Sequence, residues 1–225
     1  GLISMYILAP WVPSLRVSKQ SAKPLLSFGV PFQTNSLLAL VKDDFLTIVL
    51  GKILPLYQVG LIGWAKKWAE TPLRLLMDSV VRVTFPAYSR LQDKPEELGK
   101  ALGKAFFFLS ILIFPLTIGL VFLLKPLIFI IPKYLKWEPA LTSFYLFVLA
   151  SAIASISTPL TNALNAIGKV KTTLKLMIMW TVLVWVLTPF LVLKMGFNGV
   201  ALAQALTGVT VLVVILVVKR HIDFA

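Results

Sequence analysis

Long stretches without a charged residue divide this sequence into segments of membrane-spanning length. Five such runs cover residues 24–41, 105–124, 139–168, 176–193 and 195–218. A helix needs about 20 predominantly apolar residues to cross the hydrocarbon core of a bilayer. The runs therefore predict an all-α fold, a polytopic transmembrane helical bundle.

The composition excludes most soluble classes of protein. Hydrophobic residues make up 58% of the 225 residues and charged residues only 14%, against about 25% charged residues in an average soluble domain. The mean hydropathy is +0.90. Too few polar side chains are present to cover a soluble globule of this size. A disordered chain, a nucleic-acid-binding domain and nearly all soluble enzymes are therefore excluded.

The net charge of +13 does not require a nucleic-acid partner. Membrane proteins hold Lys and Arg in their cytoplasmic loops, and this bias sets their orientation. The chain has no cysteine and a single histidine, His221, so a disulfide framework, a thiolate metal site or a Ser-His-Asp triad inside the membrane is not available. We expect no nucleic acid, no metal and no cofactor.

The charged stretch 55–87 is also interpreted as a span, because without it the basic loops could not all lie on one side. That side carries thirteen Lys and Arg residues and the other side five, which predicts a cytoplasmic C-terminus. Residues 1–23 are interpreted as the end of a preceding transmembrane helix and a cytoplasmic linker, and 219–225 as a cytoplasmic tail. The six predicted spans of the lobe 24–218 are 24–50, 56–86, 104–130, 140–165, 174–193 and 198–218.

Local signals add three details. Residues 88–103 predict a short amphipathic helix on the cytoplasmic surface, because Asp93 and Pro95 are typical of a helix start. Residues 165–168 predict the end of the fourth span. Small residues four apart, such as Ser151 and Ser155, indicate positions where helices approach closely.

Charged residues within the second span are the most informative feature for function. A charge at the bilayer centre costs about 2.5–3.5 kcal/mol on insertion scales. At 100° per residue, the charged side chains fall within one arc of 120°, so this stripe should face water or protein inside a bundle. The residues of the stripe are Lys66, Lys67, Glu70, Arg74 and Asp78.

The first span repeats the pattern more weakly. Asn35, Ser36, Lys42 and Asp43 share one arc, whereas Asp44 lies on another face. The two stripes would line a hydrated cavity with four basic and three acidic residues. Such a cavity suits an anionic substrate that crosses the membrane. The alternative is an ion network that balances its own charge and only holds the helices together.

Signals of enzyme chemistry are nearly absent. Asp43 and Asp44 are adjacent and point about 100° apart on a helix, which is a poor geometry for an acid–base pair. The sequence contains no glycine loop for phosphates, no HExxH motif and no GxSxG motif. We expect no catalytic residue and no enzymatic activity.

Residues 25–91 contain an ordered set of short motifs. Leu26-Ser27-Phe28-Gly29-Val30-Pro31 begins the first span, Gly51 and Gly60 flank the following loop, and Phe85-Pro86-Ala87-Tyr88-Ser89-Arg90-Leu91 ends the second span. In this order they resemble the polysaccharide-biosynthesis family of lipid-linked oligosaccharide flippases, within the multidrug/oligosaccharidyl-lipid/polysaccharide exporter superfamily.

The resemblance implies two six-helix lobes around a central cavity, of which this chain would be the C-terminal half. It implies that polyprenyl-diphosphate-linked sugars move from the cytoplasmic to the outer leaflet of the cell membrane, and that basic cavity residues meet the diphosphate. Lys66 is the best-matched position, with Lys67 and Arg74 on the same arc. The implied partners are the lipid-linked oligosaccharide, membrane lipids and the missing N-terminal half, without which we expect no transport.

Three other functions stay open at this point. A cation-coupled multidrug or small-molecule antiporter of the same superfamily would favour acidic over basic cavity residues. A membrane glycan ligase or polymerase would need a large outer loop, whereas the longest predicted outer segment is 125–139. A structural assembly subunit would tolerate a charge-neutral replacement of Arg74.

Overall fold

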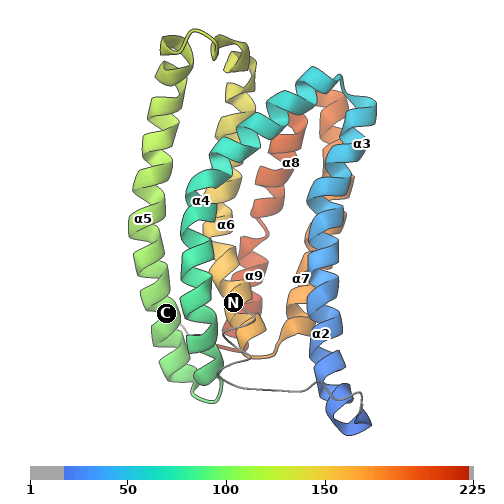
Figure 1. Ribbon diagram of the computed structural model, residues 1–225, viewed down its shortest axis with the longest axis vertical. Coiled ribbons are helices and arrows are strands. Elements are labelled where there is room, and N and C mark those ends of the chain that lie inside the picture. The colour runs from blue at the N-terminus through green and yellow to red at the C-terminus, as the bar shows by residue number, and fades with distance from the viewer. Residues whose placement is uncertain (1–17, 223–225) are drawn as a thin grey trace, which may run out of the picture.

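The computed structural model describes residues 18–222 (Figure 1). Residues 1–17 and 223–225, including all of the predicted end of a preceding helix and the end of the predicted tail, lie outside the described part. Within it, all regular secondary structure is helical. The elements are α2 Lys19–Leu40, η1 Val41–Phe45, α3 Leu46–Ile53, α4 Leu56–Arg90, α5 Pro95–Ile130, η2 Leu135–Ala140, α6 Leu141–Ala166, α7 Val170–Met195, α8 Asn198–Gly208 and α9 Val211–Lys219.

These elements form antiparallel passes along one bundle axis (Figure 1). α2, η1 and α3 are continuous and make the first pass, because the backbone stays helical at both ends of η1. The passes through α4, α5, α6 and α7 follow, and α8 with α9 makes the last. The connections at 54–55, 131–134 and 196–197 therefore lie at one end of the bundle, and those at 91–94 and 167–169 lie at the other.

Four of the passes are long and apolar enough to cross a membrane: α5, η2 with α6, α7, and α8 with α9. The other two passes contain the charged residues of the first two predicted spans and are not among the four. The chain is thus a helical membrane protein with four apolar candidate spans. The six crossings expected from the sequence are not confirmed by this measure.

Two large apolar clusters, one near each end, and a smaller one of Met77, Leu109 and Ile113 hold the bundle together. The first joins α4, α5, α6 and α7 around buried Phe144 and Phe147, and Trp64 stacks on Trp137 there with 5.2 Å between ring centroids. The second surrounds the buried ring of Tyr88 near the start of α5 and the end of α6. α4 runs obliquely and then turns to lie beside α5 (Figure 1), and Pro72 in its middle removes a backbone donor, which favours such a bend.

The predicted end of the fourth span is confirmed. α6 ends at Ala166, and Gly168 adopts a left-handed φ of +77°. The N–H of Lys169 donates to Leu164 O over 2.8 Å, and the N–H of Gly168 donates to Asn165 O over 3.1 Å. This is the Schellman pattern, which a glycine after the C-cap permits.

Two predictions for residues 88–103 are wrong, the separate amphipathic helix and its cap at Asp93. Pro95 does begin a helix, but the helix runs without a break to Ile130, so no separate amphipathic helix forms. Asp93 is not its cap, because Lys94 holds that position and pairs with Glu97 at 3.0 Å. Apolar residues from Leu98 onward bury one face of this first part of α5 and keep it in the bundle.

The last predicted span is also interrupted. α8 ends at Gly208 and α9 begins at Val211, and the Trp180 indole N–H of α7 donates to Thr210 Oγ1 between them over 2.8 Å. A hydrogen bond from a neighbouring helix is thus made at the break. The periodicity of the sequence cannot predict such a contact between helices.

The α7–α8 hairpin depends on Gly199. A Cβ at this position would lie 2.4 Å from the backbone carbonyl carbon of Leu191, and backbone cannot move aside as a side chain can. We expect Gly199→Ala to destabilise the protein by about 1–3 kcal/mol, as overpacking does, measured as a fall in melting temperature in detergent. Gly119→Ala in α5 is the control, because its Cβ would meet no atom within 4 Å. Equal melting temperatures would contradict this account of the hairpin.

Candidate functional site

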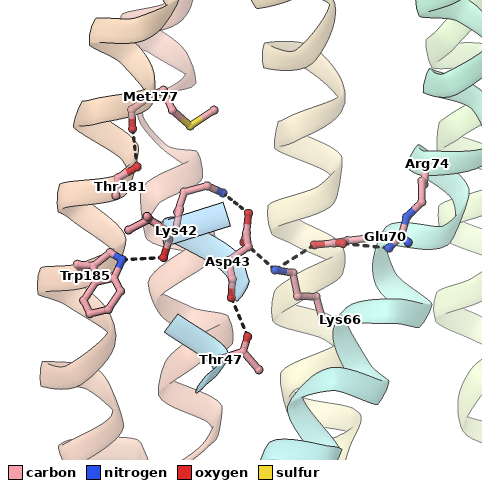
Figure 2. A network of polar contacts seen from close by, with 10 residues as sticks. Lys42, Asp43, Thr47, Lys66, Glu70, Arg74, Met177, Thr181 and Trp185 are labelled. Carbon is pink, nitrogen blue, oxygen red and sulfur yellow. Dashed lines mark hydrogen bonds and ion pairs between the residues drawn. The ribbon is translucent and has the colours of Figure 1, made fainter. Parts of the chain in front are cut away.

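An ion-pair network joins η1 to α4 (Figure 2). Lys66 Nζ lies 2.8 Å from Asp43 Oδ1 and 3.8 Å from Glu70 Oε1. Glu70 Oε2 lies 3.5 Å from Arg74 Nη2, and Lys42 Nζ lies 2.9 Å from Asp43 Oδ2. Basic and acidic groups alternate along the network. The predicted spacing of four residues on α4 therefore does place Lys66, Glu70 and Arg74 on one face.

The acidic partner on the first pass belongs to the π-helical turn η1. A π turn frees carbonyl groups from their usual i+4 donors, and such turns are frequent at functional sites. The Trp185 indole N–H of α7 donates to Val41 O over 3.1 Å, and Thr47 Oγ1 donates to Asp43 O over 2.7 Å. The ring of Trp185 also stacks on Phe45 at 5.8 Å. α7 thus holds the turn that presents Asp43 to α4.

Two cavities adjoin this network. The larger, of about 520 Å³, lies between η1, α4, α6, α7 and the α8–α9 break. The smaller, of about 420 Å³, lies between η1, the start of α3 and the first half of α4. Asp43, Glu70 and Arg74 line both. The ion network is therefore the wall that the two cavities share.

Three charged groups at the cavities have spare binding capacity. The Arg74 side chain is 60% exposed, and its only ion pair within residues 18–222 is the 3.5 Å contact with Glu70. Lys67 lines the smaller cavity and Asp78 the larger, and neither forms an ion pair in the same part of the chain. A ligand can reach these groups without breaking a close pair.

A hydroxyl-bearing wall faces the charged face of α4 across the larger cavity. Its hydroxyl-bearing residues on α6 and α8 are Ser151, Ser157, Thr158, Thr161 and Thr207, and Gln204 of α8 adds an amide group. The charge pattern of the sequence does not indicate this wall, and Ser151 was expected only as a packing position. The signal was present, since the seven-residue separation of Ser151 and Thr158 keeps both on one face of a helix.

Asn35 lies apart from the network. Its Nδ2 donates to Thr173 Oγ1 of α7 over 3.2 Å, and Thr173 Oγ1 donates to Asn165 Oδ1 over 2.6 Å. Asn35 is not among the residues that line either cavity. Asn35 was grouped with Lys42 and Asp43 on the assumption that each residue turns 100° around the helix. The π turn of Val41–Phe45 turns by a smaller angle per residue, so this assumption does not hold there.

The charge of the site differs from the expected cationic surplus. Asp44, assigned to another face by the sequence pattern, lines the smaller cavity. Together the two cavities are lined by four basic and four acidic side chains, so the site is balanced. The basic residues are Lys42, Lys66, Lys67 and Arg74, and the acidic residues are Asp43, Asp44, Glu70 and Asp78.

The part of the chain that contains this network matches a known family. The family model described as polysaccharide biosynthesis protein matches residues 1–140, which is more than half of the chain. The chain belongs to the polysaccharide biosynthesis protein family. The resemblance expected from the motifs between residues 25 and 91 is thereby confirmed.

Two curated relatives agree with this assignment. The chain is 28% identical over 166 residues to the lipopolysaccharide biosynthesis protein WzxC of Escherichia coli (strain K12), a match that covers 72% of this chain and 33% of that protein. It is 25% identical over 160 residues to an uncharacterized membrane protein in the cps region of Klebsiella pneumoniae, covering 71% of this chain and 33% of that protein. The chain thus spans about a third of the length of these relatives. No solved structure matches it.

Proposed function

We propose that this chain forms a six-helix lobe of a flippase that moves lipid-linked oligosaccharide across the cytoplasmic membrane by alternating access. A second lobe, supplied by an N-terminal six-helix half, would complete the passage. Membership of the polysaccharide biosynthesis protein family supports this class of substrate. The observation that carries the proposal is a charged wall between two cavities inside an otherwise apolar helical bundle.

In this proposal the two charged passes cross the membrane as well. The rod of α2, η1 and α3 and the helix α4 each contain 35 residues, or about 50 Å at 1.5 Å per residue, which exceeds the bilayer core of about 30 Å. Asp43 of the first pass and Lys66 of the second pair with each other, which lowers the cost of insertion, and Lys67 and Asp78 line the cavities. The end of the bundle with the connections 91–94 and 167–169 is rich in Lys and Arg and faces the cytoplasm.

The headgroup would pass beside α4 while the lipid tail stays in the bilayer. Arg74 can bind a phosphate with two parallel hydrogen bonds, and Lys66 and Lys67 act as point charges. The hydroxyl-bearing wall of α6 gives the sugar hydrogen-bonding partners on the opposite side. Asp43, Glu70 and Asp78 position the basic groups, and Asn35 instead holds α2 against α7.

One observation favours a second candidate. The larger cavity is lined by three acidic residues, Asp43, Glu70 and Asp78, but only two basic residues, Lys42 and Arg74. This excess of negative charge would suit a cation-coupled antiporter of the same superfamily. The balanced total over both cavities favours the headgroup, which presents negative phosphates and neutral hydroxyl groups together.

A flipping assay on the full-length protein in proteoliposomes tests the proposal. A fluorescent lipid-linked oligosaccharide is incorporated into the vesicles, and a membrane-impermeant reductant quenches the label only in the outer leaflet. Flipping is measured as the change with time in the fraction of label that the reductant can reach. We expect movement of this lipid and none of an organic cation such as ethidium. Movement of the cation without the lipid would contradict the flippase and support antiport.

A further inference from the structure

The ion pair between Asp43 and Lys66 lies where the two cavities adjoin, since Asp43 lines both of them and Lys66 lines the smaller. We propose that this pair is a partition between the two cavities, and that an anionic headgroup opens it by drawing Lys66 away from Asp43. The inference rests on the proposed function, because it assigns to the substrate's own phosphate the role of opening its path. The ligand chemistry is that of a diphosphate ester.

The position of the pair supports a partition. Among the described residues that line the cavities, Asp43 with Lys66 is the one ion pair between two different passes. The others join neighbours within η1 or within α4. Figure 2 shows Lys66 extending from α4 toward Asp43, with Glu70 and Arg74 continuing the wall. Separating Asp43 from Lys66 therefore removes the bridge between the walls formed by η1 and α4.

The pair is accessible to a competing anion. The side chains of Lys66 and Asp43 are 25% and 32% exposed, so water and a ligand reach both. A phosphate group offers several strong acceptor oxygens and forms short, charge-assisted hydrogen bonds with an ammonium group. An anion that enters between η1 and α4 therefore competes with Asp43 for the Lys66 ammonium group.

The network tolerates this exchange. When Lys66 turns to a phosphate, Asp43 keeps Lys42 at 2.9 Å and Glu70 keeps Arg74 at 3.5 Å. Neither carboxylate is then left without a basic partner, which would be strongly unfavourable in a partly buried site. The opened state is thus accessible, and departure of the anion restores the bridge.

These 225 residues contain no cysteine, so single cysteines introduced into them report accessibility once any cysteine elsewhere in the full-length protein is replaced. Ser157→Cys reports on the larger cavity, beyond the partition, and Gly63→Cys reports on the smaller cavity, where an added Cβ meets no atom within 4 Å. A small membrane-impermeant thiol reagent is applied to vesicles of the full-length protein from the side of the α3–α4 turn. Inorganic pyrophosphate serves as the anionic probe.

We expect pyrophosphate to raise the labelling rate of the Ser157→Cys reporter by about fivefold or more, the effect of one lost hydrogen bond on an equilibrium, and to leave the Gly63→Cys reporter unchanged. Adding Asp43→Asn should raise labelling of the Ser157→Cys reporter without pyrophosphate. Adding Lys66→Gln should also raise it and remove the response to pyrophosphate. Lys52→Gln is the control, since Lys52 lies on α3 but lines neither cavity.

The outcomes separate the partition from the proposed function. Unchanged labelling of the Ser157→Cys reporter with both Asp43→Asn and Lys66→Gln overturns the partition, even if the protein flips lipid. A second result overturns only the proposal that an anion opens the partition. In that case both variants label faster at the Ser157→Cys reporter, but pyrophosphate has no effect on the protein with intact Asp43 and Lys66. A protein that gives the expected labelling but does not flip lipid-linked oligosaccharide refutes the proposed function alone.

Discussion

Replacing Arg74 with alanine is expected to reduce lipid flipping at least about tenfold while leaving the fold intact, because a hydrogen bond to a charged group contributes about 1.5–3 kcal/mol. The side chain is 60% exposed, and its one ion pair among the described residues is the 3.5 Å contact with Glu70. Glu70 keeps Lys66 when Arg74 is lost. The loss should therefore appear in transport and not in the melting temperature.

Two variants make this expectation specific. Arg74→Lys keeps the charge but loses the paired donors of the guanidinium group, so flipping should be intermediate between the alanine variant and the native protein. Leu75→Ala changes the adjacent residue, which is 68% exposed and lies about 100° away around the helix, and should flip normally. Native rates in Arg74→Ala would support a structural assembly role and contradict substrate binding at this position.

Replacing Lys66 with methionine is expected to reduce both stability and transport, in contrast to Arg74. Asp43 loses its partner on α4, and Glu70 loses its 3.8 Å contact. We expect a loss of about 1–3 kcal/mol in the free energy of unfolding, the range for a polar group that loses its hydrogen-bonding partner. The melting temperature in detergent and the flipping rate measure the two effects separately.

Lys67→Met is the matched control for this variant. It removes the same chemical group one position along α4, but Lys67 forms no ion pair within residues 18–222, so transport should fall without a loss of stability. Exchanging the charges in the double variant Asp43→Lys with Lys66→Asp should recover only part of the stability, because the new lysine lies beside Lys42 and the new aspartate beside Glu70. It should not recover transport, since an acidic group then occupies the phosphate-binding position. A stable Lys66→Met protein would show that the bridge contributes nothing to the fold.

Four of the five charge-free runs fall on the four apolar passes, whereas the first run, 24–41, falls on α2, which is not one of them. They could not decide the first two passes, because their charges are neutralised by contacts between residues far apart in sequence, such as Asp43 with Lys66. The face of α4 was predictable from regular helical spacing. Its partner face was not, because it lies on the π turn at Val41–Phe45, where the Val41 carbonyl accepts a hydrogen bond from Trp185, 144 residues away.

The same limit explains the other differences. Asp44, within the irregular turn, lines the smaller cavity, and Asn35, ahead of that turn, bonds to Thr173 of α7. The break after α8 is likewise bonded from Trp180 on another helix. Local sequence did give the end of α6, since Gly168 supplies its own backbone conformation and needs no distant contact.

The central claim is that α4 threads the bilayer with its ionic side facing water. Nitroxide labels placed singly along α4 in reconstituted protein test it by their accessibility to a water-soluble nickel complex and to oxygen, which concentrates in lipid. Labels at Lys67, Arg74 and Asp78 should collide with the nickel complex, and labels at Leu75 and Val83, which are 68% and 72% exposed on the opposite side, should collide with oxygen. Equal nickel accessibility at all five positions, or oxygen accessibility at Lys67 and Arg74, would contradict the account.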